Sequence, residues 1–146
     1  MEIDSIRAIK LSLQFNTKTI GMQFISMVGG FLVTLALLSY GIGSITLQRF
    51  KLVSLGVLWF LSIGIFLDIA ATVCMIIGSQ NTPFSIHGLV GYSAFLLMLV
   101  DLILVWKVYK KNGKNTFINK SLVLYAKFAY GYWVIAYFTG SLMVVF

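Results

Sequence analysis

The sequence has 146 residues, of which 60% are hydrophobic and only 10% are charged, and its mean hydropathy is +0.97. A soluble domain carries about 25% charged residues, so this composition leaves too little polar surface for one and indicates an integral membrane protein. Because Cys74 is the single cysteine, the chain can form no internal disulfide and no cysteine-based zinc or iron–sulfur site.

The net charge of +7 comes mainly from short segments that separate long apolar runs. Lysine and arginine in such segments orient a membrane protein, with the more basic side in the cytoplasm. No basic patch with base-reading side chains accompanies them, so we expect no nucleic-acid partner.

Residues 1–20 form a mixed segment in which charged and apolar side chains alternate. Wound as a helix, Ile3, Ile6, Ile9 and Leu13 share one side, which predicts a short amphipathic helix lying on the bilayer surface. A partly disordered tail is the alternative. A secretory signal peptide is not expected, because two acidic residues stand where the positive n-region belongs.

Four apolar segments follow and predict helices at about 22–45, 52–78, 86–109 and 121–146. Each is long enough to cross a hydrocarbon core of ~30 Å, and continuous apolarity favours helices over a membrane β-barrel. Short connections, one of which holds the only proline (Pro83), make successive helices antiparallel. The sequence therefore predicts an all-α fold, with residues 21–146 forming an integral membrane, up-and-down four-helix bundle.

The basic residues predict the orientation of this bundle. The first and third loops with their flanks carry seven of them: Arg49, Lys51, Lys107, Lys110, Lys111, Lys114 and Lys120. The opposite side carries only Arg7, Lys10 and Lys18. We therefore expect both termini, and the end of the bundle that holds His87, to lie outside the cytoplasm.

Three ionisable side chains fall inside predicted helices, where each charge needs a partner or a function. At a rise of ~1.5 Å per residue, Asp101 and Lys127 lie about 12 Å and 9 Å from the cytoplasmic ends of their helices. This match predicts a structural ion pair, with a proton or ion relay as the alternative. Asp68 has no basic partner at its depth, so we expect it to be neutral or hydrogen-bonded, with His87 the nearest candidate.

His87 is the only histidine, and it shares one helical face with Gly91, Ala94, Met98 and Asp101. The small residues on this face are typical of close packing between membrane helices. They would equally leave a flat slot for a porphyrin whose iron is bound by His87. A hydrated histidine at a helix end is a further alternative.

The sequence does not determine which group would be the second axial ligand of such an iron. Met75 lies at nearly the same depth as His87, about 34 Å against 33 Å by the same count. His87 and Met75 together, or His87 alone, would therefore serve, and a homo-oligomer would allow two histidines to share one haem.

The sequence lacks the parts for other chemistry. It has no second histidine for a metal triad, no serine–histidine–aspartate arrangement and no phosphate-binding glycine loop. We therefore expect no hydrolase or kinase activity, and any activity would be the redox chemistry of a bound haem.

Residues 66–72, 86–100 and 136–140 resemble a family of small four-helix bacterial membrane proteins, the haem-sensing membrane protein A (HsmA) family. The resemblance covers roughly residues 31–146. It implies haem capture in the plasma membrane and protection against haem toxicity and oxidative stress. His87, Gly88, Gly91 and Asp68 match the pattern of that family.

The chain departs from the same pattern at two positions. Many members of the family have a second histidine where this chain has Asp101, and another where it has Asn119. Because we expect Asp101 to pair with Lys127, the position of Asp101, nearer the cytoplasmic end, is closed to a second haem. The leading hypothesis is therefore one haem b near the outer leaflet, held by His87 beside Gly88, Gly91, Ala94 and Asp68.

Two other functions remain open from the sequence. A small transporter or permease subunit would use Asp101, Lys127 and Asp68 as its polar pathway. An accessory subunit of a larger membrane complex is suggested by small residues on the first helix that would receive a partner (Gly29, Gly30, Gly41 and Gly43).

Overall fold

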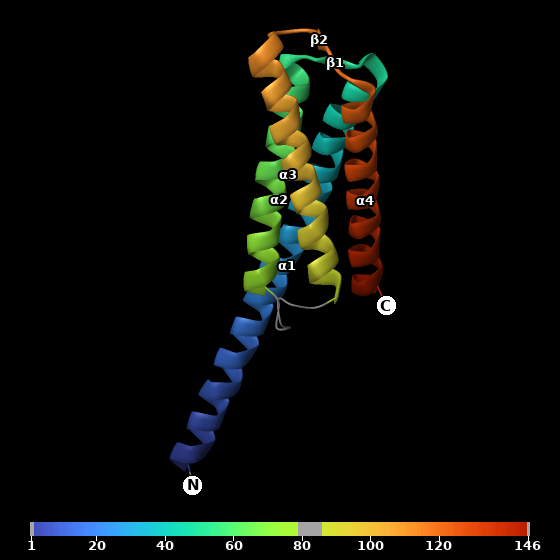
Figure 1. The fold of residues 1–146 in the computed structure, drawn as a ribbon. Helices are drawn as coiled ribbons and strands as arrows, with labels where there is room; N and C mark the ends of the chain where they lie inside the picture. Colours follow the sequence, from blue (N-terminus) through green and yellow to red (C-terminus); the bar gives the residue numbers. More distant parts are fainter. Residues whose placement is uncertain (1, 79–85, 146) are drawn as a thin grey trace.

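The computed structural model describes residues 2–78 and 86–145, with side chains from 5 to 142 within these ranges. The predicted loop with Pro83, at 79–85, lies outside the described residues. Four helices account for most of the chain (Figure 1): α1 (Glu2–Phe50), α2 (Leu55–Gly78), α3 (Ile86–Asn112) and α4 (Lys120–Val145). Two strands of two residues each complete it: β1 (Leu52–Val53) and β2 (Thr116–Phe117). The all-α prediction is confirmed.

Successive helices run in opposite directions and lie side by side as a bundle (Figure 1), with α1 packed on α2 and α4, and α3 packed on α2 and α4. By length and apolar composition, α1, α2 and α3 could each cross a membrane. Over its described residues, α4 is not among the helices that meet this criterion.

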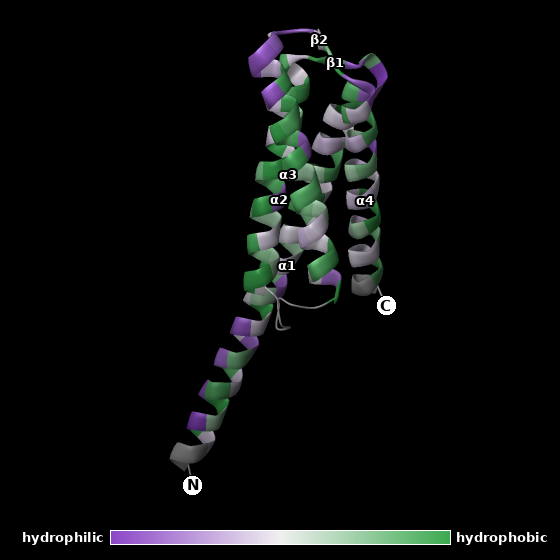
Figure 2. Cartoon of the chain, in the orientation of Figure 1, coloured by the Kyte–Doolittle hydropathy of each residue, from purple (hydrophilic) through white to green (hydrophobic). Residues whose placement is uncertain are grey.

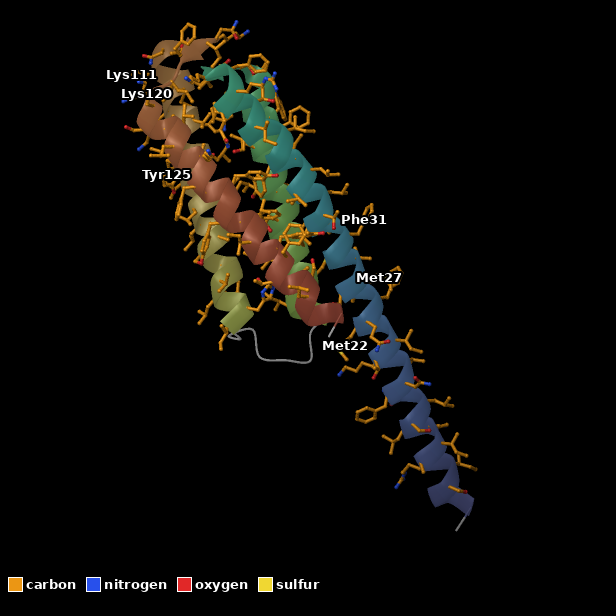
Figure 3. The ribbon with its side chains drawn as sticks, turned by 90° about the vertical axis from the view of Figure 1, so that its right-hand side faces the viewer. Met22, Met27, Phe31, Lys111, Lys120 and Tyr125 are labelled. Atoms are coloured by element: carbon orange, nitrogen blue, oxygen red, sulfur yellow. The ribbon has the colours of Figure 1, made fainter. Side chains whose placement is uncertain are left out.

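The first helix differs most from the prediction. The N-terminal segment is helical, but it continues without a break into the first apolar segment, so that α1 has 49 residues. This length corresponds to roughly 74 Å, about two and a half times the thickness of a hydrocarbon core. The N-terminal part of α1 projects beyond the bundle (Figures 1 and 3), and Met27 and Phe31 further along it point outward.

Glycines bring α1 and α2 into close contact. A Cβ at Gly43 of α1 would lie 3.0 Å from Leu61 Cγ, and one at Gly64 of α2 would overlap the ring of Tyr40. Gly78 of α2 likewise meets the backbone of α1. Small residues of this kind let membrane helices approach closely.

Most of the glycines expected to receive a partner subunit instead pack against other helices of the same chain. Gly29 and Gly43 face α2, and Gly41 faces Tyr130 of α4. A Cβ at Gly30 would meet nothing within 4 Å, so Gly30 alone stays open. The accessory-subunit hypothesis therefore loses most of the feature that suggested it.

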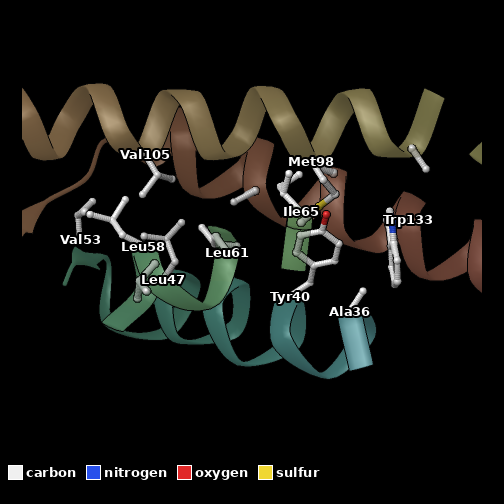
Figure 4. Packing of buried hydrophobic residues seen from close by; sticks show 14 of the residues in the cluster. Ala36, Tyr40, Leu47, Val53, Leu58, Leu61, Ile65, Met98, Val105 and Trp133 are labelled. Atoms are coloured by element: carbon white, nitrogen blue, oxygen red, sulfur yellow. The ribbon is translucent and has the colours of Figure 1, made fainter. Parts of the chain in front are cut away.

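The core runs along the axis of the bundle and includes side chains from all four helices (Figure 4). Tyr40 of α1, Leu61 and Ile65 of α2, Met98 of α3 and Trp133 of α4 are buried in it. The aliphatic half lies toward β1 and the aromatic half lies beyond Ile65 (Figure 4).

The two loops at the opposite end from the termini are joined by β1 and β2, which pair antiparallel with Leu52 opposite Phe117. The Ile118 amide also donates to the Lys51 carbonyl at 2.9 Å. This pairing gathers the basic loop residues at one end, which is the most hydrophilic part of the bundle itself (Figure 2). All seven basic residues of these loops and their flanks are exposed.

Candidate functional site

His87 lies one residue after the start of α3, at the end of the bundle that holds the termini. Its half-buried imidazole rests on Gly140 of α4, where a Cβ would lie only 2.6 Å from Cε1 and 2.7 Å from Nε2. No other residue could occupy position 140 without displacing the ring. A glycine near the end of α4 therefore positions the histidine between α3 and α4.

One ring nitrogen of His87 has no hydrogen-bond partner among the described residues. Nδ1 is buried, and no described residue makes a hydrogen bond with it. Buried polar atoms are nearly always hydrogen-bonded, so an orphaned nitrogen calls for an explanation such as a ligand. Of the two ring nitrogens, Nε2 lies closer to Gly140, at 2.7 Å from where a Cβ would be, and Nδ1 lies further away, at 3.7 Å.

The helical face predicted for His87 does turn toward the interior. Ala94 and Met98 are each only 1% exposed, and Asp101 is fully buried. Gly91, one turn after His87, is half-buried, and a Cβ there would meet nothing within 4 Å. Close packing between helices therefore does not explain Gly91, whereas it does explain Gly140.

Gly88 and Met75 complete the residues proposed around the histidine. Gly88 is half-buried beside His87 on α3. Met75 lies in the interface of α1 and α2, with Cγ 3.0 Å from where a Cβ of Gly29 would be. The structure thus places Met75 and His87 in different helix interfaces, because the packing of α1 on α2 fixes which way Met75 turns. Met75 contacts α1, whereas His87 contacts α4.

Asp68 is buried where α1, α2 and α4 meet. Its Oδ2 accepts a hydrogen bond from Trp133 Nε1 at 2.9 Å and a longer one from the Tyr40 hydroxyl at 3.4 Å. The expectation that Asp68 is hydrogen-bonded to another helix is confirmed, but its partners are Trp133 and Tyr40 rather than His87. Trp133 precedes Gly140 by about two helical turns, so the imidazole lies roughly 10 Å further along the bundle.

Aromatic rings extend the layer around Asp68. Tyr40 meets Trp133 edge to face, with ring centroids 5.1 Å apart, and Tyr137 stacks on Trp133 at 6.1 Å. The Tyr137 hydroxyl is 3.1 Å from Thr34 Oγ1 of α1 and hydrogen-bonds to it. This layer ties α4 to α1 and α2 between Asp68 and the histidine.

The predicted ion pair between Asp101 and Lys127 does not form. Neither carboxylate oxygen of Asp101 has a hydrogen-bond partner among the described residues, although the side chain is fully buried. Lys127 is exposed on α4. Lys127 therefore does not take part in the interior polar pathway that the transporter hypothesis requires.

The rotation of α4 explains why this prediction was wrong. The side of α4 that faces α3 carries Tyr125, which donates to the Leu97 carbonyl at 3.1 Å, and Tyr132, which hydrogen-bonds Ser93. Lys127 stands two residues after Tyr125, about 160° around the helix. The two charges match in depth, but they face different directions.

No cluster of three or more histidine, cysteine, aspartate or glutamate side chains that could hold a metal occurs in the described ranges 2–78 and 86–145. A metal centre built from several protein ligands thus has no candidate there. Haem is a different case, because the porphyrin supplies four ligands and the protein needs to supply only one. The residues present fit a single axial ligand, His87, and not a pair.

Comparisons with protein-family models, with curated proteins and with solved structures found no match to this chain. The fold and the site therefore define the class of protein by themselves. It is a bundle of four helices, three of which are long and apolar enough to cross a membrane, with one histidine between α3 and α4.

Sequence reasoning missed three residues of this region, namely Gly140, Trp133 and Tyr40. Gly140 closes the last block that resembles the HsmA family, which is a signal for it. Trp133 and Tyr40 belong to no motif that the sequence analysis identifies. Nothing in the spacing along their own helices indicates a hydrogen bond to Asp68.

Proposed function

We propose that this chain is a four-span protein of the bacterial plasma membrane that binds one haem b at the extracytoplasmic end of its bundle. His87 is the protein ligand, and the role is sequestration of haem or protection against haem and oxidative stress. The observation that carries the proposal is the buried, unpartnered Nδ1 of His87. A haem held there would supply one-electron iron chemistry.

The surroundings of His87 are compatible with a flat ligand on one side of the imidazole ring. Gly140 fixes the other side, and the space beside Gly91 has no protein atom within 4 Å of a would-be Cβ. Ala94, a turn further on, keeps the same face small. The layer of Asp68, Trp133 and Tyr40 closes the bundle below this position and has its own hydrogen bonds satisfied.

The proposal includes α4 as the fourth span, although α4 is not among the three helices whose described residues are long and apolar enough to cross a membrane. Its 26 residues correspond to roughly 39 Å, enough for a ~30 Å core. The hydroxyls of Tyr125, Tyr132 and Tyr137 each have a partner on another helix. Polar groups satisfied inside the bundle are compatible with the hydrocarbon region. With the basic loops in the cytoplasm, both termini are extracytoplasmic.

Haem titration of the detergent-purified protein tests the proposal. We expect a Soret band of ligated haem for the wild type and its loss in His87→Ala, with the helix content unchanged by circular dichroism. A wild-type protein that cannot be loaded with haem would contradict the proposal. So would a His87→Ala variant that binds haem as the wild type does.

Two glycines provide a matched test of the space beside the ring. Gly91→Leu fills that space, and we expect it to weaken haem binding roughly tenfold, since overpacking costs ~1–3 kcal/mol. Gly131→Leu is the control, because Gly131 is exposed on α4 and a Cβ there also meets nothing within 4 Å. Equal effects of the two substitutions would contradict the placement of haem beside Gly91.

A further inference from the structure

An apolar groove of about 600 Å³ lies between α1 and α4, away from His87. Leu37, Leu38, Ile42 and Ile45 line it from α1, and Tyr130 and Val134 line it from α4. Gly41 also lines it, where the absence of a side chain leaves room under the Tyr130 hydroxyl. Its volume is within the range of roughly 300–1,000 Å³ found for sites that hold small organic molecules.

The groove spans one leaflet of the bilayer. From Leu37 to Thr46 it extends over nine residues of α1, or roughly 14 Å, which is close to half of a ~30 Å hydrocarbon core. Thr46 is only four residues from the end of α1 at Phe50. The groove therefore lies in the leaflet next to the basic loops.

An exposed lysine borders this groove on α4. Lys127 is three residues before Tyr130 and seven before Val134, so it lies on the flank of α4 that turns toward the groove. It stands roughly 10 Å beyond the start of α4 at Lys120, inside the apolar region. A lysine at that depth extends its ammonium group toward the headgroups, where an anion would pair with it.

The chain does not supply this anion. Its sequence has four acidic residues, and Glu2 and Asp4 belong to the far end of α1. Asp101 is fully buried and Asp68 is 6% exposed, each on the interior of the bundle. A second copy of the chain would bring no exposed carboxylate to this depth either, so the counter-charge belongs to the lipid.

We infer that the groove between α1 and α4 binds an anionic phospholipid of the cytoplasmic leaflet. An acyl chain lies along the groove, and the phosphate meets Lys127. The inference rests on the membrane placement proposed above and is independent of the haem site.

The test uses haem-free protein in mixed micelles that contain either phosphatidylglycerol or phosphatidylcholine. Affinity is read from the rise of the unfolding midpoint with lipid concentration, because a ligand that binds the folded state stabilises it. We expect phosphatidylglycerol to bind more tightly than phosphatidylcholine. Lys127→Gln should reduce phosphatidylglycerol affinity about fivefold, the factor that corresponds to ~1 kcal/mol per basic residue near an anionic surface. Phosphatidylcholine affinity should stay unchanged.

Lys111→Gln is the matched control, because Lys111 is an exposed lysine in the last turn of α3, at the same end of the bundle, and does not line the groove. Val134→Trp, which narrows the groove, should weaken both lipids. Equal affinities of the wild type for the two lipids would overturn the inference. A loss of affinity in Lys111→Gln as large as that in Lys127→Gln would do so as well. Since no haem is present, neither result bears on His87.

Discussion

Two buried carboxylates, Asp68 and Asp101, have opposite surroundings in this bundle. Asp68 accepts hydrogen bonds from two helices, whereas both oxygens of Asp101 are unpartnered among the described residues. A buried polar group stabilises a fold only when its hydrogen bonds are made. We therefore expect the two side chains to contribute to stability with different signs.

Paired alanine substitutions test this difference. Asp68→Ala leaves the Trp133 indole and the Tyr40 hydroxyl without their acceptor, and should lower the free energy of unfolding by ~1–3 kcal/mol. Asp101→Ala removes an unpartnered polar group of the same size, and should leave that free energy unchanged or raise it. Denaturant unfolding in detergent, followed by circular dichroism, measures both. A larger loss in Asp101→Ala than in Asp68→Ala would contradict the hydrogen-bond pattern.

At this scale the sequence predicts depth and burial better than partners. The interior face of Ala94, Met98 and Asp101 follows from helical periodicity, and the structure confirms it. Counting residues at a fixed rise also places Asp101 and Lys127 at similar depth. Their relative direction depends on how α4 rotates, which the hydrogen bonds of Tyr125 and Tyr132 to α3 determine. Those bonds are not visible in the spacing of one helix.

Glycine residues let the backbones of α1 and α2 approach each other closely. Gly64 of α2 receives the ring of Tyr40, which is itself fully buried. The interface therefore depends on the absence of a side chain at this position.

Gly64→Ala tests the contact between α1 and α2. The added methyl group would collide with Tyr40, and we expect it to lower the free energy of unfolding by ~1–3 kcal/mol. Gly56→Ala on the same helix is the control, since its Cβ would meet only Ser54 Oγ at 3.8 Å. It should be neutral or stabilise the helix by up to ~1 kcal/mol. Equal thermal unfolding of the two variants would be the contrary result.

Helix boundaries were predictable where the sequence contains a break. The predicted helices 52–78, 86–109 and 121–146 agree within a few residues with α2, α3 and α4. The break expected near residue 20 is absent, because no proline or cluster of turn residues interrupts the helix there. A change in charge alone does not end a helix.

The whole molecule has a strong asymmetry of charge between its ends. The two basic loops are held together by β1 and β2, so the positive charge is concentrated at the end opposite the termini (Figure 2). The proposed membrane orientation, which follows the positive-inside rule, puts this end in the cytoplasm.

Cysteine labelling in intact bacteria tests this orientation. In a Cys74→Ser background, Lys10→Cys should react with a membrane-impermeant maleimide from outside. Lys114→Cys, in the loop before β2, should react only after the membrane is permeabilised, because the proposed orientation puts the basic loops in the cytoplasm. The reverse pattern would contradict the proposed orientation. Reaction of both in intact cells would contradict the bundle crossing the membrane.

The number of haems bound per chain tests the central proposal most directly. With a single histidine, and with Met75 in a different helix interface, the bundle offers one axial ligand and one site. A Soret titration of the wild-type protein should therefore reach its end point at one haem per chain, and the same titration of His87→Ala should show no specific end point. An end point that His87→Ala shares with the wild type, or the absence of any end point in the wild type, would contradict haem binding through His87.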